Sequence, residues 1–150
     1  MRAVIQRVSD VKVIVDDEIT GKIGAGLLIL LGVEAEDGEE DVEWLCEKTT
    51  KLRIFSDEDG KMNRSVADID GGVLVVSQFT LHAKYKKGTR PSFIKAAPPE
   101  HAERLYKDFC DALTRTLNKP CQSGRFGAHM DVHLINDGPV TIWIDTKNKE

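Results

Sequence analysis

The sequence predicts one α+β domain over residues 1–150, with a barrel-like β-sheet core and two main amphipathic helices. Many short segments are continuously apolar or alternate apolar and polar residues between Gly, Asp or Pro turns, as β-strands do. Only two segments repeat apolar residues at the spacing of an amphipathic helix. No repeat, low-complexity tract or linker divides the chain, and its length suits one core.

The first third of the chain is predicted to form β-strands. Ala3–Val8 is rich in apolar residues, and the valines of Val11–Val15 alternate with other side chains. The pair Asp16-Asp17 then predicts a turn into a further strand, Glu18–Ile23. Leu27–Leu31 is continuously apolar, which predicts a strand buried on both faces.

The first helix is expected to begin at Asp37, because Glu40 follows at the spacing of a capping box. Its buried stripe is predicted to contain Val42, Leu45, Cys46, Thr49 and Leu52. A short strand at Arg53-Ile54-Phe55 and a turn at Asp57–Gly60 should follow.

The strand Val73–Val76 follows two glycines and should deliver Ser77 and Gln78 at its C-terminal end. The next segment, His82–Pro98, is long, basic and irregular, and such loops are usually functional.

The second helix is expected to start at Pro98-Pro99, because proline suits the first helical turn, and to end at Asn118-Lys119-Pro120. Its apolar stripe is Ala102, Leu105, Tyr106, Phe109, Leu113 and Leu117. Two more strands should follow, with core-facing positions at Met130, Val132 and Leu134 and then at Val140, Ile142 and Ile144. The Gly138-Pro139 dipeptide between them is typical of a tight turn.

Composition narrows the functional classes. A net charge of −4 argues against a protein that coats DNA through a broad basic face. No apolar run reaches membrane-spanning length and no signal sequence is evident, so we expect a cytoplasmic protein without a membrane partner. The three cysteines are odd in number and lack CxxC spacing, which predicts reduced thiols at Cys46, Cys110 and Cys121.

Common catalytic motifs are missing: the sequence has no GxSxG, HExxH or P-loop. His129, Asp131 and His133 share one face of a predicted strand, where solvent exposure explains them better than a metal site, so no metal is expected. His82 and His101 are isolated, and we expect each to be solvated.

Ser77-Gln78-Phe79-Thr80 follows a buried strand, where a pocket could open. A polar strand exit capped by Ser and Thr is one explanation, and an active site is the other. A hydroxyl nucleophile needs a base, and none is near in sequence, so backbone N–H groups forming an oxyanion hole are equally consistent with such a site.

The loop after this motif is locally basic. It carries Lys84, Lys86, Lys87, Arg90 and Lys95, with Tyr85 and Phe93 among them. Phosphate contact is one use of such a patch, and a simply solvated loop is the other.

Taken together, the Ser77–Thr80 and Asn136–Thr141 motifs resemble those of the D-aminoacyl-tRNA deacylases, also called D-Tyr-tRNA deacylases. The resemblance extends over essentially the whole chain. It also includes Met1–Val8, Lys61-Met62-Asn63, Leu74–Leu81 and Arg90-Pro91-Ser92-Phe93.

The resemblance implies hydrolysis of the ester between a D-amino acid and the 3′-terminal adenosine of tRNA, by a homodimer that needs no cofactor. Gly138-Pro139 would be cis and would reach into the partner's active site, where its carbonyls bind the substrate amino group and exclude an L side chain. Glycine has no Cβ, so glycyl-tRNA, including glycine mischarged on tRNA-Ala, should also be accepted. Arg7 would brace this dipeptide.

In the same resemblance, Ser77, Gln78, Phe79 and Thr80 line the pocket around the ester, and Lys84, Lys86, Lys87 and Arg90 meet the tRNA acceptor end. No DNA partner is implied. Two alternatives stay open: a tRNA-end binding module without catalysis, and an editing domain that removes mischarged L-amino acids.

Overall fold

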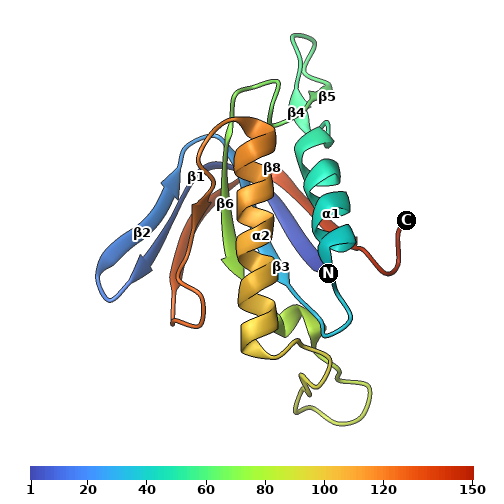
Figure 1. The fold of residues 1–150 in the computed structure, drawn as a ribbon. Coiled ribbons are helices and arrows are strands. Elements are labelled where there is room, and N and C mark those ends of the chain that lie inside the picture. The colour runs from blue at the N-terminus through green and yellow to red at the C-terminus, as the bar shows by residue number, and fades with distance from the viewer.

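A computed structural model describes all 150 residues as a strongly curved six-stranded sheet with two helices on its outer face (Figure 1). The elements in chain order are β1 Arg2–Val15, β2 Glu18–Ile23, β3 Gly26–Gly32, α1 Glu39–Lys51, β4 Phe55–Ser56, β5 Met62–Arg64, β6 Gly72–Ser77, the 3₁₀ helix η1 Phe79–His82, α2 Pro99–Leu117, β7 Gln122–Ser123 and β8 Asp131–Asp145. The expected α+β class and the two helices are confirmed.

Strand β1 organises the sheet. One of its edges pairs antiparallel with β8, and the other pairs first with β3 and then with β2. From β3 the sheet continues through parallel pairings to β6 and β7. It then returns to β2, because a Cβ built at Gly21 would lie 2.7 Å from the Ser123 carbonyl oxygen. The sheet is therefore a nearly closed barrel.

Two apolar cores lie on opposite faces of this sheet. The larger joins its outer face to α1 and α2 and includes Phe109 and Leu27, both fully buried. The smaller fills the barrel and contains valines from the second half of β1, such as Val8 and Val11, together with Val76 at the end of β6. The predicted run Leu27–Leu31 alternates between the two cores, so its burial on both faces is confirmed.

A bulge lets β1 keep valines inside the barrel along its length. Val8 pairs with Asn136 and Asp10 with Ile135, so Ser9 is the extra residue. An extra residue reverses the side-chain alternation beyond it. Val8 and Val11 consequently point to the same core although their spacing is odd.

The two strands predicted near the C-terminus are one continuous strand, β8, so the expected tight turn at Gly138-Pro139 is wrong. Asn136 pairs with Val8 and Thr141 with Gln6, which leaves residues 137–140 opposite Arg7 alone. The dipeptide thus lies in a wide bulge. Pairing with β1 on both sides outweighs the local turn signal.

The predicted burial along β8 is correct only in part. Met130 and Val132 pack against the barrel core and Val140 is buried, but Leu134 is 37% exposed. Ile142 and Ile144 are half-buried against the helix-side core. Leu134 pairs with Val11, whose side chain is in the barrel core, so Leu134 lies on the face of the sheet that the helices do not cover.

Helix α1 spans Glu39–Lys51, so its N-cap lies one residue later than the predicted Asp37. Its N-cap is Gly38, whose amide donates to the Asp41 carboxylate at 3.0 Å. Asp37 is instead buried, where it binds the Met1 ammonium at 2.6 Å and the Glu34 amide at 2.8 Å. The capping-box spacing exists, but it is displaced by one residue because the Asp37 carboxylate has other partners.

Helix α2 agrees with the sequence. Pro99 occupies its first turn, and Asn118 ends it in the left-handed conformation at φ 51°. The expected strand at residues 53–55 is displaced to Phe55–Ser56, which pairs with β5 across the predicted turn. None of the helices is long and apolar enough to cross a membrane.

Candidate active site

A cavity of about 560 Å³ opens where β6 ends, between the start of α2 and the loop before β8. Its walls are mostly apolar, and Ser77 and Gln78 supply polar groups from the end of β6. The other lining residues are Val33, Val76, Phe79, Ala96, Ala97, Pro99, Ala102, Phe126, Gly127, Ala128, His129, Met130 and Val132. An apolar cavity with a few polar groups at one end is typical of a small-molecule site.

Ser77, Gln78 and Phe79 of the Ser77–Thr80 motif line this cavity, and Thr80 follows them in η1 without lining it. The Gln78 amide donates to the Leu31 carbonyl at 2.7 Å, which ties the motif to β3. The chain then turns into η1, and the Phe79 and Thr80 amides at its start have no acceptor within the chain. The motif therefore presents free N–H donors beside an apolar cavity, as the oxyanion-hole explanation requires.

Thr80 has no base to activate it. Its hydroxyl oxygen accepts a hydrogen bond from Gln78 Nε2 at 2.6 Å, and its side chain is exposed. No carboxylate or imidazole shares a hydrogen bond with it. This arrangement orients the hydroxyl without increasing its nucleophilicity.

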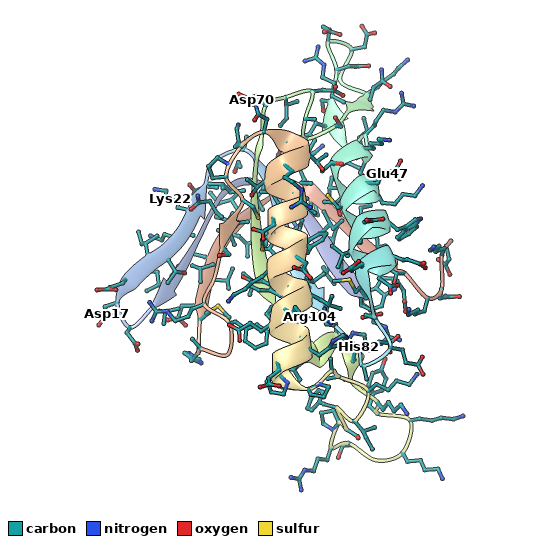
Figure 2. The ribbon with its side chains drawn as sticks, viewed as in Figure 1. Asp17, Lys22, Glu47, Asp70, His82 and Arg104 are labelled. Carbon is teal, nitrogen blue, oxygen red and sulfur yellow. The ribbon has the colours of Figure 1, made fainter.

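His82, expected to be solvated, is fully buried at the end of η1 (Figure 2). It lies against Gly32, and Nδ1 is 3.8 Å from the nearest Glu34 carboxylate oxygen. Neither ring nitrogen has a hydrogen-bond partner. Burial lowers the pKa of His82 below its ordinary value, because the charged ring would lose its hydration. Arg2 holds the same helix by donating to the Leu81 carbonyl at 2.9 Å.

The remaining histidines are on the surface or close to it. His101 is half-buried with Nε2 2.9 Å from the Asp37 carbonyl oxygen, so it is not freely solvated as predicted. His129, Asp131 and His133 are exposed. His129 Nε2 lies 3.7 Å from an Asp131 oxygen, and no three His, Cys, Asp or Glu side chains are placed to hold a metal ion.

Gly138 and Pro139 are exposed in the β8 bulge, and the peptide bond between them is cis. Arg7 lies beneath them: its Nε donates to the Asp137 carbonyl at 3.0 Å and its Nη1 to the Ile54 carbonyl at 2.7 Å. Asn136 closes the bulge, since its Oδ1 accepts from the Val140 amide at 3.0 Å. Sequence reasoning missed the contribution of Ile54, because a backbone acceptor leaves no sequence signal. It included Asn136 in the motif but assigned no role to its side chain.

The two motifs do not meet within one chain. Arg7 pairs with Leu27 of β3, whereas Ser77 pairs with Leu31, four residues further along the same strand. At the rise of a β-strand this is about 13 Å along the sheet, before the spacing between strands is added. Gly138 and Pro139 do not line the cavity of their own chain.

Apart from the buried His82, which ends η1, the predicted basic segment His82–Pro98 is largely exposed and has no helix or strand of its own. Lys84 and Ser92 close it with two backbone hydrogen bonds, of 2.8 and 2.9 Å. Phe93 packs edge-on against Phe79 with ring centres 5.1 Å apart, which joins the segment to the cavity edge. The Lys84, Lys86, Lys87 and Arg90 side chains all point to solvent near this edge.

The chain is similar to known proteins over nearly its whole length. A family model described as D-Tyr-tRNA(Tyr) deacylase matches residues 4–145. A D-aminoacyl-tRNA deacylase of Opitutus terrae is 59% identical over 150 residues, and one of Bacteroides thetaiotaomicron is 56% identical over 150 residues; in both, the match covers the whole of each chain.

Solved structures agree on the fold. The c-Myc DNA Unwinding Element Binding Protein superposes with a TM-score of 0.92 at 42% identity, covering 97% of this chain and 99% of the other. A probable eukaryotic D-amino acid tRNA deacylase gives 0.83 at 17% identity, covering 95% and 97%, which supports the fold alone. Because the family model and the curated relatives span nearly the whole sequence, the chain belongs to the D-Tyr-tRNA(Tyr) deacylase family.

Proposed function

We propose that this chain hydrolyses the ester of D-aminoacyl-tRNA, releasing the free D-amino acid and tRNA. The observation that carries the proposal is the apolar cavity edged by Ser77–Thr80, in a chain whose full-length relatives are named D-aminoacyl-tRNA deacylases. The cavity accommodates the terminal adenosine and the ester beside it. Such a substrate places the enzyme in the cytoplasm, where tRNA is charged.

Backbone groups supply the catalysis in this proposal. The Phe79 and Thr80 amides donate to the ester carbonyl oxygen as negative charge develops on it, which lowers the barrier to attack. Water attacks the carbonyl carbon, and the substrate's ribose 2′-hydroxyl assists by relaying its proton to the departing 3′-oxygen. Thr80 and Gln78 position the reacting groups, consistent with the absence of a base beside Thr80.

Chiral selection is assigned to Gly138 and Pro139 of a second copy of the chain. They lie far from their own cavity, are exposed, and are held by Arg7, so they are free to enter the cavity of a partner. Ile135 and Trp143 on the same strand are 61% and 51% exposed, so β8 leaves large apolar side chains that a second copy could cover. In the partner's site the two carbonyls would bind the amino group and exclude an L side chain, and glycine would pass.

The test uses tRNA charged with labelled D-Tyr, L-Tyr or glycine. We expect release of D-Tyr and glycine and retention of L-Tyr. Release of L-Tyr at a similar rate would contradict chiral selection and favour an editing domain for mischarged L-amino acids. Sedimentation of the protein alone tests the homodimer, because a monomer at the assay concentration would leave Gly138 without a site to enter.

A second candidate is a nucleic-acid binding module without catalysis. The observation that favours it is the exposed basic segment, together with the DNA-element binding named for the 42% identical relative. It predicts tight retention of uncharged tRNA or of DNA with no ester cleavage, so filter binding beside the deacylation assay separates the two functions.

A further inference from the structure

The segment from Ala83 to Ala96, which we call the cationic arm, carries an unusual charge. It holds five of the chain's 21 Lys and Arg residues and none of its 25 Asp and Glu residues. All five cations are exposed, and none forms an ion pair. In Figure 2 nitrogen-tipped side chains spread outward from this part of the ribbon, beyond the end where His82 lies. A concentration of unpaired positive charge on an acidic protein is suited to a polyanion.

The arm is fixed to the cavity at its base. Beyond the Lys84–Ser92 bridge, the Ala97 amide donates to the Val33 carbonyl at 2.9 Å, and Ala97 and Val33 both line the cavity. The Phe79–Phe93 contact makes a second attachment. A molecule that leaves the cavity on this side therefore passes directly along the arm.

Tyr85 lies among these cations, and no other residue covers its ring. Tyr85 is 75% exposed and lies between Lys84 and Lys86. Its ring has no aromatic partner and its hydroxyl no hydrogen-bond partner in the chain. An exposed aromatic ring flanked by cations is the combination with which proteins bind single-stranded nucleic acid: bases stack on the ring and phosphates meet the charges.

We propose that Tyr85 is a stacking platform for the unpaired nucleotides that precede the terminal adenosine of tRNA, with Lys84, Lys86 and Lys87 contacting their phosphates. This inference rests on the proposed function, since it takes the terminal adenosine to occupy the cavity. Tyr85 thereby recognises the single-stranded tail, whereas the cavity recognises the ester.

The first experiment compares two substrates, D-Tyr-tRNA and D-tyrosyl-adenosine, which has the ester but no tail. For Tyr85→Ala we expect KM for D-Tyr-tRNA to rise roughly tenfold, the loss of one stacked base, with little change in kcat. Tyr85→Phe, which keeps the ring, should restore the wild-type KM. With D-tyrosyl-adenosine the difference between Tyr85→Ala and wild type should disappear.

The second experiment separates stacking from charge by the salt dependence of binding to an uncharged single-stranded RNA ending in CCA. Replacing both Lys86 and Lys87 with Ala should reduce the slope of log affinity against log salt by roughly 1.4, or about 0.7 per phosphate contact on a single strand. Tyr85→Ala should weaken binding without changing the slope. Lys22→Ala, an exposed lysine on β2 away from the arm (Figure 2), is the charge-matched control and should change neither quantity.

Equal KM values for wild type and Tyr85→Ala on D-Tyr-tRNA would overturn the proposal, as would an equal defect on D-tyrosyl-adenosine. Unaltered RNA binding by all arm variants would point instead to an acidic protein partner. If wild type cleaved neither substrate, the proposed function would fail, whereas the RNA-binding experiment would still decide whether Tyr85 stacks.

Discussion

Replacing Gly138 with Ala tests whether the shape of the β8 bulge sets activity. Gly138 has φ +135°, a conformation that L side chains rarely adopt. A Cβ there would lie 2.9 Å from Val140 Cγ2 and 3.0 Å from Arg7 Nη2, and one of these neighbours would have to move. The substitution therefore disturbs both the backbone of the bulge and the guanidinium that supports it.

The size of the effect follows from the cost of the backbone conformation. A non-glycine residue held in such a region costs about 1–3 kcal/mol. Because residues 137–140 are mostly exposed, the variant can release this strain by shifting the bulge rather than by unfolding. Returning to the native shape for catalysis then costs the same energy. We expect kcat/KM for D-Tyr-tRNA to fall roughly 5- to 150-fold, at about 1.4 kcal/mol per tenfold.

The assay is single-turnover deacylation of D-Tyr-tRNA and L-Tyr-tRNA, with thermal unfolding measured beside it. Gly60→Ala is the matched control, because Gly60 also has a positive φ, +74°, but has open space around its Cβ position. It should lower stability slightly and leave deacylation unchanged. Wild-type rates and wild-type discrimination in Gly138→Ala would refute the assignment of Gly138 to substrate selection.

Three further outcomes are expected. Thr80→Ala should keep activity within about tenfold of wild type, because no base activates its hydroxyl; a loss of several orders of magnitude with intact folding would make Thr80 the nucleophile. His82 has a lowered pKa when folded, so below its ordinary value of 6.5 the unfolded chain binds a proton that the folded chain does not. Stability should therefore fall as pH decreases through that value, and urea midpoints at about pH 7.5 and about pH 5.5 should differ less in His82→Gln than in wild type. Phe109→Ala should lower the free energy of unfolding by about 3–5 kcal/mol in urea titration, because Phe109 is fully buried between α2 and the sheet.

Sequence patterns correctly predicted the helices and strands that are determined by their own residues. The apolar run Leu27–Leu31 and the stripe of α2 each specify burial locally, and both are confirmed. The start of α1 was misplaced because the Asp37 carboxylate binds the Met1 ammonium, which is distant in sequence. His82 was predicted to be solvated for a similar reason, since its burial depends on Gly32 at the end of β3 and on Glu34 just after it, both distant in sequence.

Sequence reasoning located the candidate site but not its shape. Ser77 and Gln78 were correctly placed at the C-terminal end of a strand, because polar residues directly follow the apolar run Val73–Val76. The cavity itself is assembled from β6, the start of α2 and the loop before β8, and no single segment carries a signal for it. The turn signal of Gly138-Pro139 was locally sound but is outweighed by pairing with β1.

The β8 bulge also bears on how such a protein can change over evolution. Its four residues, 137–140, are bracketed by pairings of Asn136 and Thr141 with β1 that fix the register on either side. A different tetrapeptide, or one of another length, could replace them without displacing a core residue other than Val140. The sheet therefore tolerates an exchangeable insert at this position, and under the proposed function a few mutations there would change the substrate preference while the rest of the fold stays the same.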